Sequence, residues 1–226
     1  MNPSQFYLFF MFLLISATRL GAQYWQQFVD YKIEVDLNPE TAIYSGKQTV
    51  EYKNNSPETL KKVFFHLYFN AFQPGSQMDL RSRTIADPDS RVMDRIQQLT
   101  PDEIGYLHVQ DLVQDGKTVT YAEEGTILIV DLAEPLLPQS STLLEMAFEG
   151  QVPVQIRRSG RNNKEGVDLT MTQWFPKLSE YDHEGWHPNP YIGREFHGVW
   201  GDYTVNITID KSYVVAGTGY LENTEE

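Results

Sequence analysis

Alternating apolar and polar side chains run through most of the chain and predict β-strands. In residues 28–37, Ile33 and Val35 alternate with charged neighbours, as in a strand that buries one face. The same pattern predicts further strands at residues 43–53, 107–113, 118–121, 126–132, 142–148, 199–209 and 213–221. The last two segments are expected to pair as a hairpin across residues 210–212. Short strands between turn signals predict an all-β sandwich or a twisted open sheet.

A few residues predict features within or between these strands. Residues 63–69 are apolar at nearly every position, which predicts a strand buried on both faces. Ser45 and Gly46 predict a bulge or kink inside the second strand. Asp115 and Gly116 form a dipeptide that is typical of a tight hairpin turn.

Two segments do not read as strands. Residues 70–105 mix arginines with aspartates and predict a long surface excursion rather than a separate domain. Within it, residues 91–99 carry apolar side chains at helical spacing, which predicts one or two helical turns. Residues 157–166 are basic and rich in Asn and Gly, and they predict a solvent-facing loop, with an anion or partner contact as the alternative.

The beginning of the chain predicts export. Residues 6–15 form an apolar run that is too short to span a bilayer, which needs about 20 residues. Small residues follow it, and Gln23 begins a polar and aromatic stretch. This order predicts a signal peptide at residues 1–22, cleaved near Ala22, with a buried apolar helix as the alternative. The remainder is expected to be periplasmic, in the cell envelope or extracellular, with no membrane span.

Charge and composition exclude several classes of function. The chain has 226 residues and a net charge of −13, so it has no basic surface with which to neutralise nucleic-acid phosphates. The same charge argues against binding to an anionic membrane surface. The absence of cysteine excludes disulfides, a thiol nucleophile and cysteine-ligated zinc.

Residues 183–187 read His-Glu-Gly-Trp-His and match the zinc-protease pattern H-E-x-x-H. That pattern binds zinc only on a helix, where both histidines lie on one face. Gly185 inside the motif and Pro188 directly after it oppose a helix. A glutamate ligand nineteen residues after the second histidine is also missing, because position 206 is Asn206. We therefore expect a loop here, with no catalytic residue and no metal ligand in this chain.

The second half of the chain resembles a known family. The segments that carry the resemblance are Thr-Gln-Trp-Phe-Pro-Lys at 172–177, Gly-Trp-His-Pro at 185–188, Phe-His-Gly-Val-Trp-Gly-Asp-Tyr at 196–203, and Tyr-Val-Val-Ala-Gly-Thr-Gly at 213–219. They are similar to the N-terminal β-domain of the M1 family of zinc aminopeptidases, the gluzincins, and in particular to its secreted bacterial members. The resemblance covers about residues 27–224, and residues 196–219 are its most specific part.

The resemblance implies a large, saddle-shaped, mostly antiparallel β-domain (a sheet or sandwich) at residues 23–226, lying against a catalytic domain of the same polypeptide. In the family, the Gly-x-Met-x-Asn segment and the helical zinc motif lie downstream of this domain. The resemblance therefore implies that these residues hold no cofactor and are catalytically silent alone, whereas the full-length parent binds zinc and cleaves peptides. The missing catalytic domain and a peptide substrate are the implied partners.

One site residue follows from the resemblance. In the family, the glutamine of a Thr-Gln-x-Glu segment lines the substrate pocket and the acidic residue binds the free α-amine. Gln173 matches the glutamine, so substrate binding is implied for it, whereas Phe175 stands at the acidic position and cannot pair with an ammonium group. The alternative for Gln173 is a polar side chain satisfied by the backbone at the end of a strand.

A second class of function stays open. An exported, free-standing β-sandwich could use aromatic side chains to bind a protein or a glycan. A peptidase domain would instead bury one face against its catalytic domain, and some of Trp174, Trp186 and Trp200 would be exposed without it. The reading frame beyond codon 226 discriminates between the two.

Overall fold

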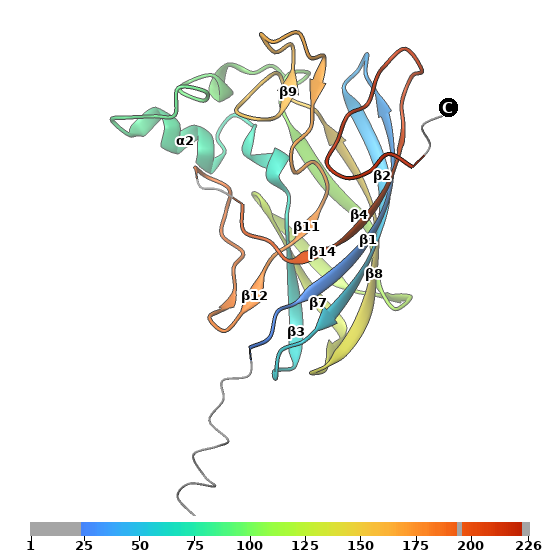
Figure 1. The fold of residues 1–226 in the computed structure, drawn as a ribbon. Coiled ribbons are helices and arrows are strands. Elements are labelled where there is room, and N and C mark those ends of the chain that lie inside the picture. Colours follow the sequence, from blue (N-terminus) through green and yellow to red (C-terminus); the bar gives the residue numbers. More distant parts are fainter. Residues whose placement is uncertain (1–23, 194–195, 223–226) are drawn as a thin grey trace, which may run out of the picture.

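The strands form two sheets that face each other across one core (Figure 1). This computed structural model describes residues 24–193 and 196–222. The fold is all-β and mostly antiparallel with short helical segments, so the predicted fold class is confirmed. The predicted signal peptide at residues 1–22 lies outside the described residues. Within the described part of the chain, no helix is long and apolar enough to cross a membrane.

The larger sheet has six strands. In spatial order they are β14 (Trp200–Thr208), β1 (Phe28–Asn38), β2 (Ile43–Asn54), β8 (Ser140–Gln151), β4 (Tyr106–Gln114) and β5 (Lys117–Thr118). Neighbouring strands are antiparallel except β14 and β1, which are parallel. The last strand in the sequence thus lies beside the first, at one edge of this sheet.

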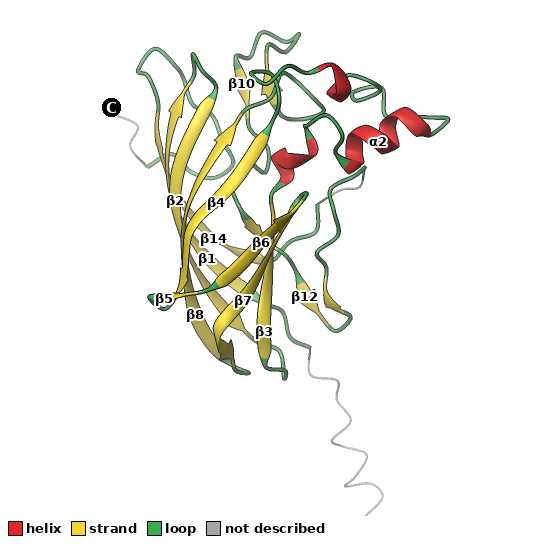
Figure 2. Cartoon of the chain, turned by 180° about the vertical axis from the view of Figure 1, so that it is seen from behind, coloured by secondary structure: helices red, strands yellow, loops and turns green. Residues whose placement is uncertain are grey.

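The second sheet and the helical segments cover the other side of the core. Its strands are β11 (Lys177–Leu178), β3 (Leu60–His66), β7 (Ile127–Leu136) and β6 (Thr120–Glu124). Two small ribbons pair β9 (Gly160–Arg161) with β10 (Leu169–Thr170), and β12 (Tyr181–Asp182) with β13 (Gly185–Trp186). The helical segments are η1 (Tyr68–Ala71), α2 (Gln77–Thr84) and η2 (Ile96–Gln98) (Figure 2).

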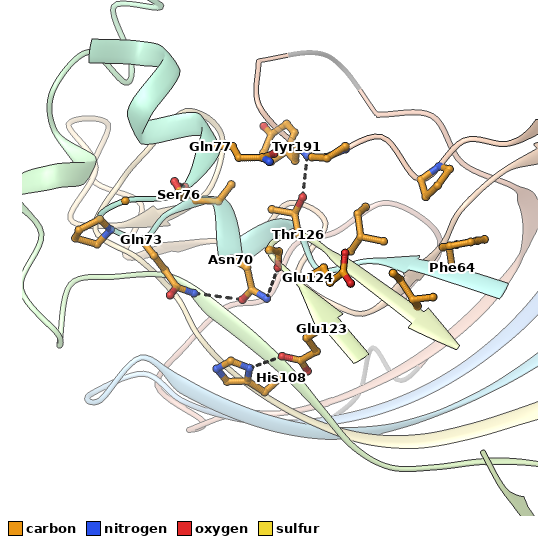
Figure 3. A pocket seen from close by; sticks show the side chains of 18 residues that line it. Phe64, Asn70, Gln73, Ser76, Gln77, His108, Glu123, Glu124, Thr126 and Tyr191 are labelled. Atoms are coloured by element: carbon orange, nitrogen blue, oxygen red, sulfur yellow. Dashed lines mark hydrogen bonds and ion pairs between the residues drawn. The ribbon is translucent and has the colours of Figure 1, made fainter. Parts of the chain in front are cut away.

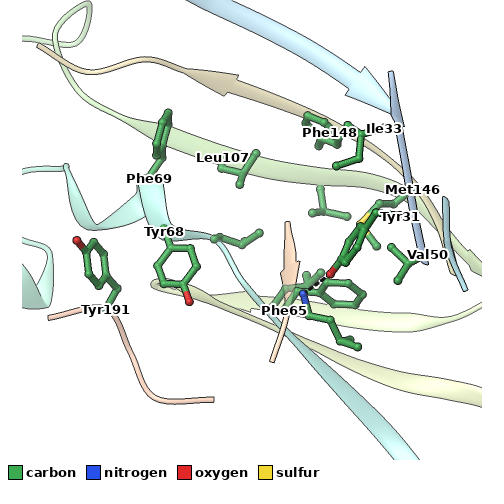
Figure 4. Packing of buried hydrophobic residues seen from close by; sticks show 14 of the residues in the cluster. Tyr31, Ile33, Val50, Phe65, Tyr68, Phe69, Leu107, Met146, Phe148 and Tyr191 are labelled. Atoms are coloured by element: carbon green, nitrogen blue, oxygen red, sulfur yellow. Dashed lines mark hydrogen bonds between the residues drawn. The ribbon is translucent and has the colours of Figure 1, made fainter. Parts of the chain in front are cut away.

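Alternation places one face of each main strand in the core (Figure 4). On β1, Tyr31 and Ile33 are buried, whereas the lysine and glutamate beside them are exposed. Val63 and Phe65 of β3 face them from the second sheet and are completely buried. Each fully buried side chain of this size stabilises the fold by about 1.5–3 kcal/mol. The period-two pattern is therefore the direct cause of the two-layer arrangement.

The predicted helical turn in residues 91–99 is confirmed, since η2 forms there after a run of turns. The longer helix, α2, was not predicted. Ser76 caps α2 by accepting a hydrogen bond from Asp79 N at 3.1 Å, and Asp79 is bidentately bound by Arg83 one turn later. Ser-Gln-Met-Asp is thus a capping signal at the beginning of the helix.

The bulge predicted at Ser45 and Gly46 does not form. The register of β2 against both neighbours runs without a shift through this residue. Gly46 instead lies beneath the ring of Phe148, where a Cβ would approach the ring Cζ to 2.4 Å. The register shift occurs in β4 between Gln110 and Val113, around Asp111, whose φ is +52°. The glycine therefore accommodates a cross-strand aromatic ring.

The predicted strand at residues 63–69 ends earlier, at His66, and η1 follows it. Leu67 N donates to Thr126 O, and the side chain of Asn70 accepts from Leu107 N at 2.7 Å. These bonds turn the chain across the end of the sheet. The predicted Asp115–Gly116 turn is confirmed, since both residues have positive φ and connect β4 to β5.

Two further expectations are corrected. The predicted hairpin of residues 199–209 with 213–221 does not form, because β14 pairs with β1 and the second segment has no strand. Gly219 there has a φ of +111°, which interrupts an extended ladder. The loop at residues 157–166 is not wholly solvent-facing, because the side chain of Arg157 is 5% exposed and its Nε lies 3.5 Å from Asp89 Oδ2.

Candidate functional site

Core side chains hold residues 174–178 against the inner face of the large sheet. Tyr44 Oη donates to Trp174 O at 2.7 Å, and Gln48 Nε2 donates to Pro176 O at 2.9 Å. The backbone N of Leu178 donates to Tyr31 Oη at 2.8 Å. The three bonds engage every second residue of the segment. They fix a stretch with little regular structure of its own, and they place it across the open end of the core.

Gln173 directly precedes this stretch and has a strained backbone conformation. Its φ is +59°, in the left-handed region that costs an ordinary residue about 1–2 kcal/mol. Its Oε1 is buried and finds no hydrogen-bond partner within residues 24–193 and 196–222. Backbone strain and an unsatisfied buried polar atom both need a compensating reason, and functional sites are where such features concentrate. The alternative of a glutamine satisfied by the backbone does not describe this oxygen.

A cleft of about 1000 Å³ lies beside Gln173. Apolar side chains from β1 and β14 form one wall of it, including Val35, Val205 and Ile207. Residues 212–218 and 167–169 contribute the rest of the rim. An apolar cleft with a few polar groups is the usual form of a small-molecule or peptide site. The wall from β14 was not anticipated, because the sequence placed that strand in a hairpin.

Phe175 fills the position at which the resemblance implies an acidic residue. Its ring packs edge-on against Tyr31 at 5.5 Å and against Tyr203 at 6.0 Å between centroids. The side chain is thus part of an aromatic cluster and provides no charge. Among the described residues that line the cleft, the single carboxylate is that of Asp168, which is exposed.

The edge of the large sheet at β14 is open. In the described part of the chain, β14 pairs with β1 on one side and with no strand on the other. Its inward-facing Tyr203, Val205 and Ile207 are 42%, 41% and 45% exposed, although they are level with fully buried residues of β1. Trp200 is 72% exposed, as expected for one of the three tryptophans. Exposed apolar surface of this kind marks an interaction site.

The His-Glu-x-x-His segment is a β-hairpin. Asp182 pairs with Gly185, and His183 and Glu184 form the turn between β12 and β13. His183 is exposed in that turn, so the two histidines of the motif do not share a helix face. The helix required by a zinc-protease motif is absent from this segment. His187 instead lies near Asp182 and His197. Among the described residues, these three side chains form the group that could hold a metal ion.

A second cavity, of about 760 Å³, lies near the start of α2 and the turn between β6 and β7 (Figure 3). Its polar side chains are engaged with one another and with the backbone. Asn70 Oδ1 accepts from Leu107 N at 2.7 Å, and His108 Nδ1 lies 2.8 Å from Glu123 Oε2. The other oxygen of Glu123 accepts from Val109 N at 2.7 Å. These bonds tie β4 to β6, so they favour a structural role.

Comparison with known proteins gives similarity to solved structures alone. Neither a protein-family model nor a curated protein matches the chain. An M1 zinc metallopeptidase mutant from Deinococcus radiodurans, bound to a Tyr-Ser-Ala substrate, is 16% identical with a TM-score of 0.44, covering 80% of this chain and 32% of that one. A two-domain M1 zinc metallopeptidase mutant bound to L-tryptophan is 15% identical with a TM-score of 0.44, covering 81% and 33%.

Yeast LTA4 hydrolase in complex with bestatin is 13% identical with a TM-score of 0.31, covering 61% of this chain and 18% of that one. The chain thus spans about a third or less of the length of the solved structures that it matches. At these identities and TM-scores, the likeness assigns neither a family nor an activity.

Proposed function

We propose that this chain is the β-domain of an exported zinc metallopeptidase of the M1 type, and that its cleft lines the substrate site. The observation that carries the proposal is Gln173, a strained residue with an unpaired buried oxygen beside an apolar cleft. It is the same residue to which the sequence resemblance assigns substrate contact. Two independent lines, one from sequence and one from geometry, thus meet at one side chain.

In this proposal the cleft receives the first residues of a peptide. The amide of Gln173 hydrogen-bonds the peptide, and the apolar wall from β1 and β14 takes its side chains. Asp168 takes the free α-amine, because Phe175 provides no carboxylate. Metal-activated water and a general base come from a catalytic domain that carries zinc. This chain then supplies binding and orientation rather than the chemistry itself.

The open edge at β14 supplies the second role in this proposal, docking of the catalytic domain. A sheet edge with half-exposed apolar side chains is a liability for a protein that stands alone, and native proteins usually cover such edges. The edge adjoins the cleft, since Tyr203, Val205 and Ile207 belong to both. A domain docked there would close the cleft and exclude water from the bound peptide.

The experiment is a peptidase assay of the protein encoded by the longest reading frame that contains this chain. We expect hydrolysis of aminoacyl fluorogenic peptides that is abolished by a zinc chelator and restored by zinc. Acetylation of the peptide amine should lower kcat/KM by about 10–100-fold, since a hydrogen bond between charged groups contributes about 1.5–3 kcal/mol. A frame that ends at codon 226, together with saturable binding of a protein or glycan, would instead favour the free-standing binding module.

A further inference from the structure

The β12–β13 hairpin gathers acidic and histidine side chains on one of its faces. His187 N donates to Glu180 O, so this pair extends the hairpin beyond the Tyr181–Trp186 pair. Since side chains alternate across a strand, Glu180, Asp182 and His187 share one face. Tyr181 and Trp186 project from the other face, where their ring centroids lie 5.0 Å apart.

A second histidine reaches this face from a distant segment. Ser179 and Gly198 form an antiparallel bridge, which brings the residues preceding β14 alongside β12. His197 therefore lies next to the hairpin, with its ring 4.8 Å from the ring of His187 between centroids. One ligand atom each from Asp182, His187 and His197 lie within 4.8 Å of one another.

The contact between His187 and Asp182 is close but poorly formed as a hydrogen bond. His187 Nε2 lies 2.9 Å from Asp182 Oδ1, yet this buried nitrogen makes no hydrogen bond of acceptable geometry with any described residue. Asp182 Oδ1 also accepts from Glu184 N at 2.8 Å, which holds the carboxylate in place. A nitrogen and an oxygen that bind one cation would show this combination of short distance and poor alignment.

The spacing of the ligand atoms fits one metal ion. In a tetrahedral zinc site, ligand atoms about 2.1 Å from the ion lie about 3.4 Å apart. The exposed side chain of His197 closes the remaining gap by a shift of up to about 1.4 Å.

We propose that Asp182, His187 and His197 bind a divalent transition-metal ion, with zinc as its representative, and that the ion ties the β12–β13 hairpin to the segment leading into β14. Two imidazoles and a carboxylate suit zinc and similar ions rather than calcium or magnesium. The site uses the second histidine of the His-Glu-x-x-His segment and leaves out the first. It differs from the sequence-based expectation that this chain holds no metal ligand, and it does not depend on the proposed peptidase function.

The test is calorimetric titration of the chelator-treated, purified chain with zinc. We expect one zinc per chain and an increase in Tm on binding. Cobalt(II) in place of zinc should give visible absorption bands of a nitrogen- and oxygen-ligated ion. His197→Gln should weaken zinc binding by at least about tenfold, since even loss of an outer-shell partner costs that much.

Matched variants make the result decisive. His183→Gln changes an exposed histidine of the same hairpin and should alter zinc affinity less than about twofold, because this residue lies in the turn. Because His197 is exposed, His197→Gln should retain the fold, which far-ultraviolet circular dichroism verifies. No stoichiometric zinc binding, zinc binding that survives His197→Gln, or an equal loss of zinc affinity in His183→Gln and His197→Gln would each overturn the proposal.

Discussion

His66 shows how a single buried residue can control the response of this fold to acid. It is 4% exposed at the end of β3, stacked on Tyr68 at 4.9 Å between ring centroids. Neither ring nitrogen has a hydrogen-bond partner in the described part of the chain. Burial, and then the charge of Lys177, lower the pKa of His66 from 6.5 to about 4. The folded state therefore holds this imidazole neutral, and protonation favours unfolding.

We predict an acid-labile fold that becomes less labile when His66 is replaced. A lowered folded-state pKa means that the full stability is present above about pH 6.5 and is lost as the pH falls towards 4. The loss attributable to His66 at pH 4.5 is about 2–3 kcal/mol. Urea unfolding of the metal-free chain at pH 7 and pH 4.5 measures it.

His66→Phe is the informative variant, because it keeps a ring on Tyr68 and removes the titration. It should be at least as stable as the wild type at pH 7, since no buried nitrogen is left unpaired. It should also lose about 2–3 kcal/mol less between pH 7 and pH 4.5. An equal loss in both proteins would show that other groups cause the acid response.

At this residue scale the sequence proposes candidate side chains but not their geometry. Gln173 is a candidate through its match to a family segment, whereas its positive φ and unpaired oxygen depend on the anchoring of residues 174–178 by distant strands. The juxtaposition of His187 with His197 could not be predicted either, because the Ser179–Gly198 bridge creates it. Alternation around position 182 would place Asp182 and His187 on one face, once the segment is recognised as a hairpin.

At the scale of elements, β14 depends on a glycine in its second pair with β1. Gly201 pairs with Val29, and a Cβ at position 201 would lie 2.0 Å from Val29 O. No side chain fits between the two backbones, although the φ of Gly201 is ordinary. The parallel pairing that forms the wall of the cleft thus requires glycine here.

We predict that Gly201→Ala loosens β14 and destabilises the chain by about 2 kcal/mol, within the usual cost of overpacking. Gly217→Ala is the matched control, since an added Cβ there meets no described atom within 4 Å. It should change stability by less than about 0.5 kcal/mol. Chemical denaturation measures the stability, and amide hydrogen exchange of residues 200–208 locates the loss. Equal effects of the two substitutions would contradict the account of β14.

Most strands could be predicted because each buries alternate side chains, and local sequence carries that pattern. The apolar spacing of Val92 and Ile96 predicted the helical turn at η2, where both side chains are buried. The longer helix, α2, was missed because its signal lies in the Ser76 cap rather than in an apolar stripe. The parallel pairing of β14 with β1 joins the first and last described strands, and no local pattern records it.

At the scale of the whole molecule, the cleft, the open edge of β14 and the residues around Gln173 lie together. One wall of the cleft is the inner face of the open strand, so whatever covers that edge also affects the cleft. This continuity is what a domain needs if it is to orient a substrate for chemistry performed by a neighbouring domain. Under the proposed function, a docked catalytic domain would cover these half-exposed apolar side chains, whereas in a free-standing module they would face solvent or a ligand.

The measurement that tests this account most directly compares Gln173→Ala with Gln139→Ala in the peptidase assay of the full reading frame. Gln139 is also a glutamine with a φ of +59°, but it is exposed in the turn before β8 and does not line the cleft. The account predicts that Gln173→Ala lowers kcat/KM by about 10–100-fold, as loss of a substrate hydrogen bond does, while Gln139→Ala leaves it within about twofold. Equal kcat/KM values for the two variants would show that Gln173 does not contact the substrate.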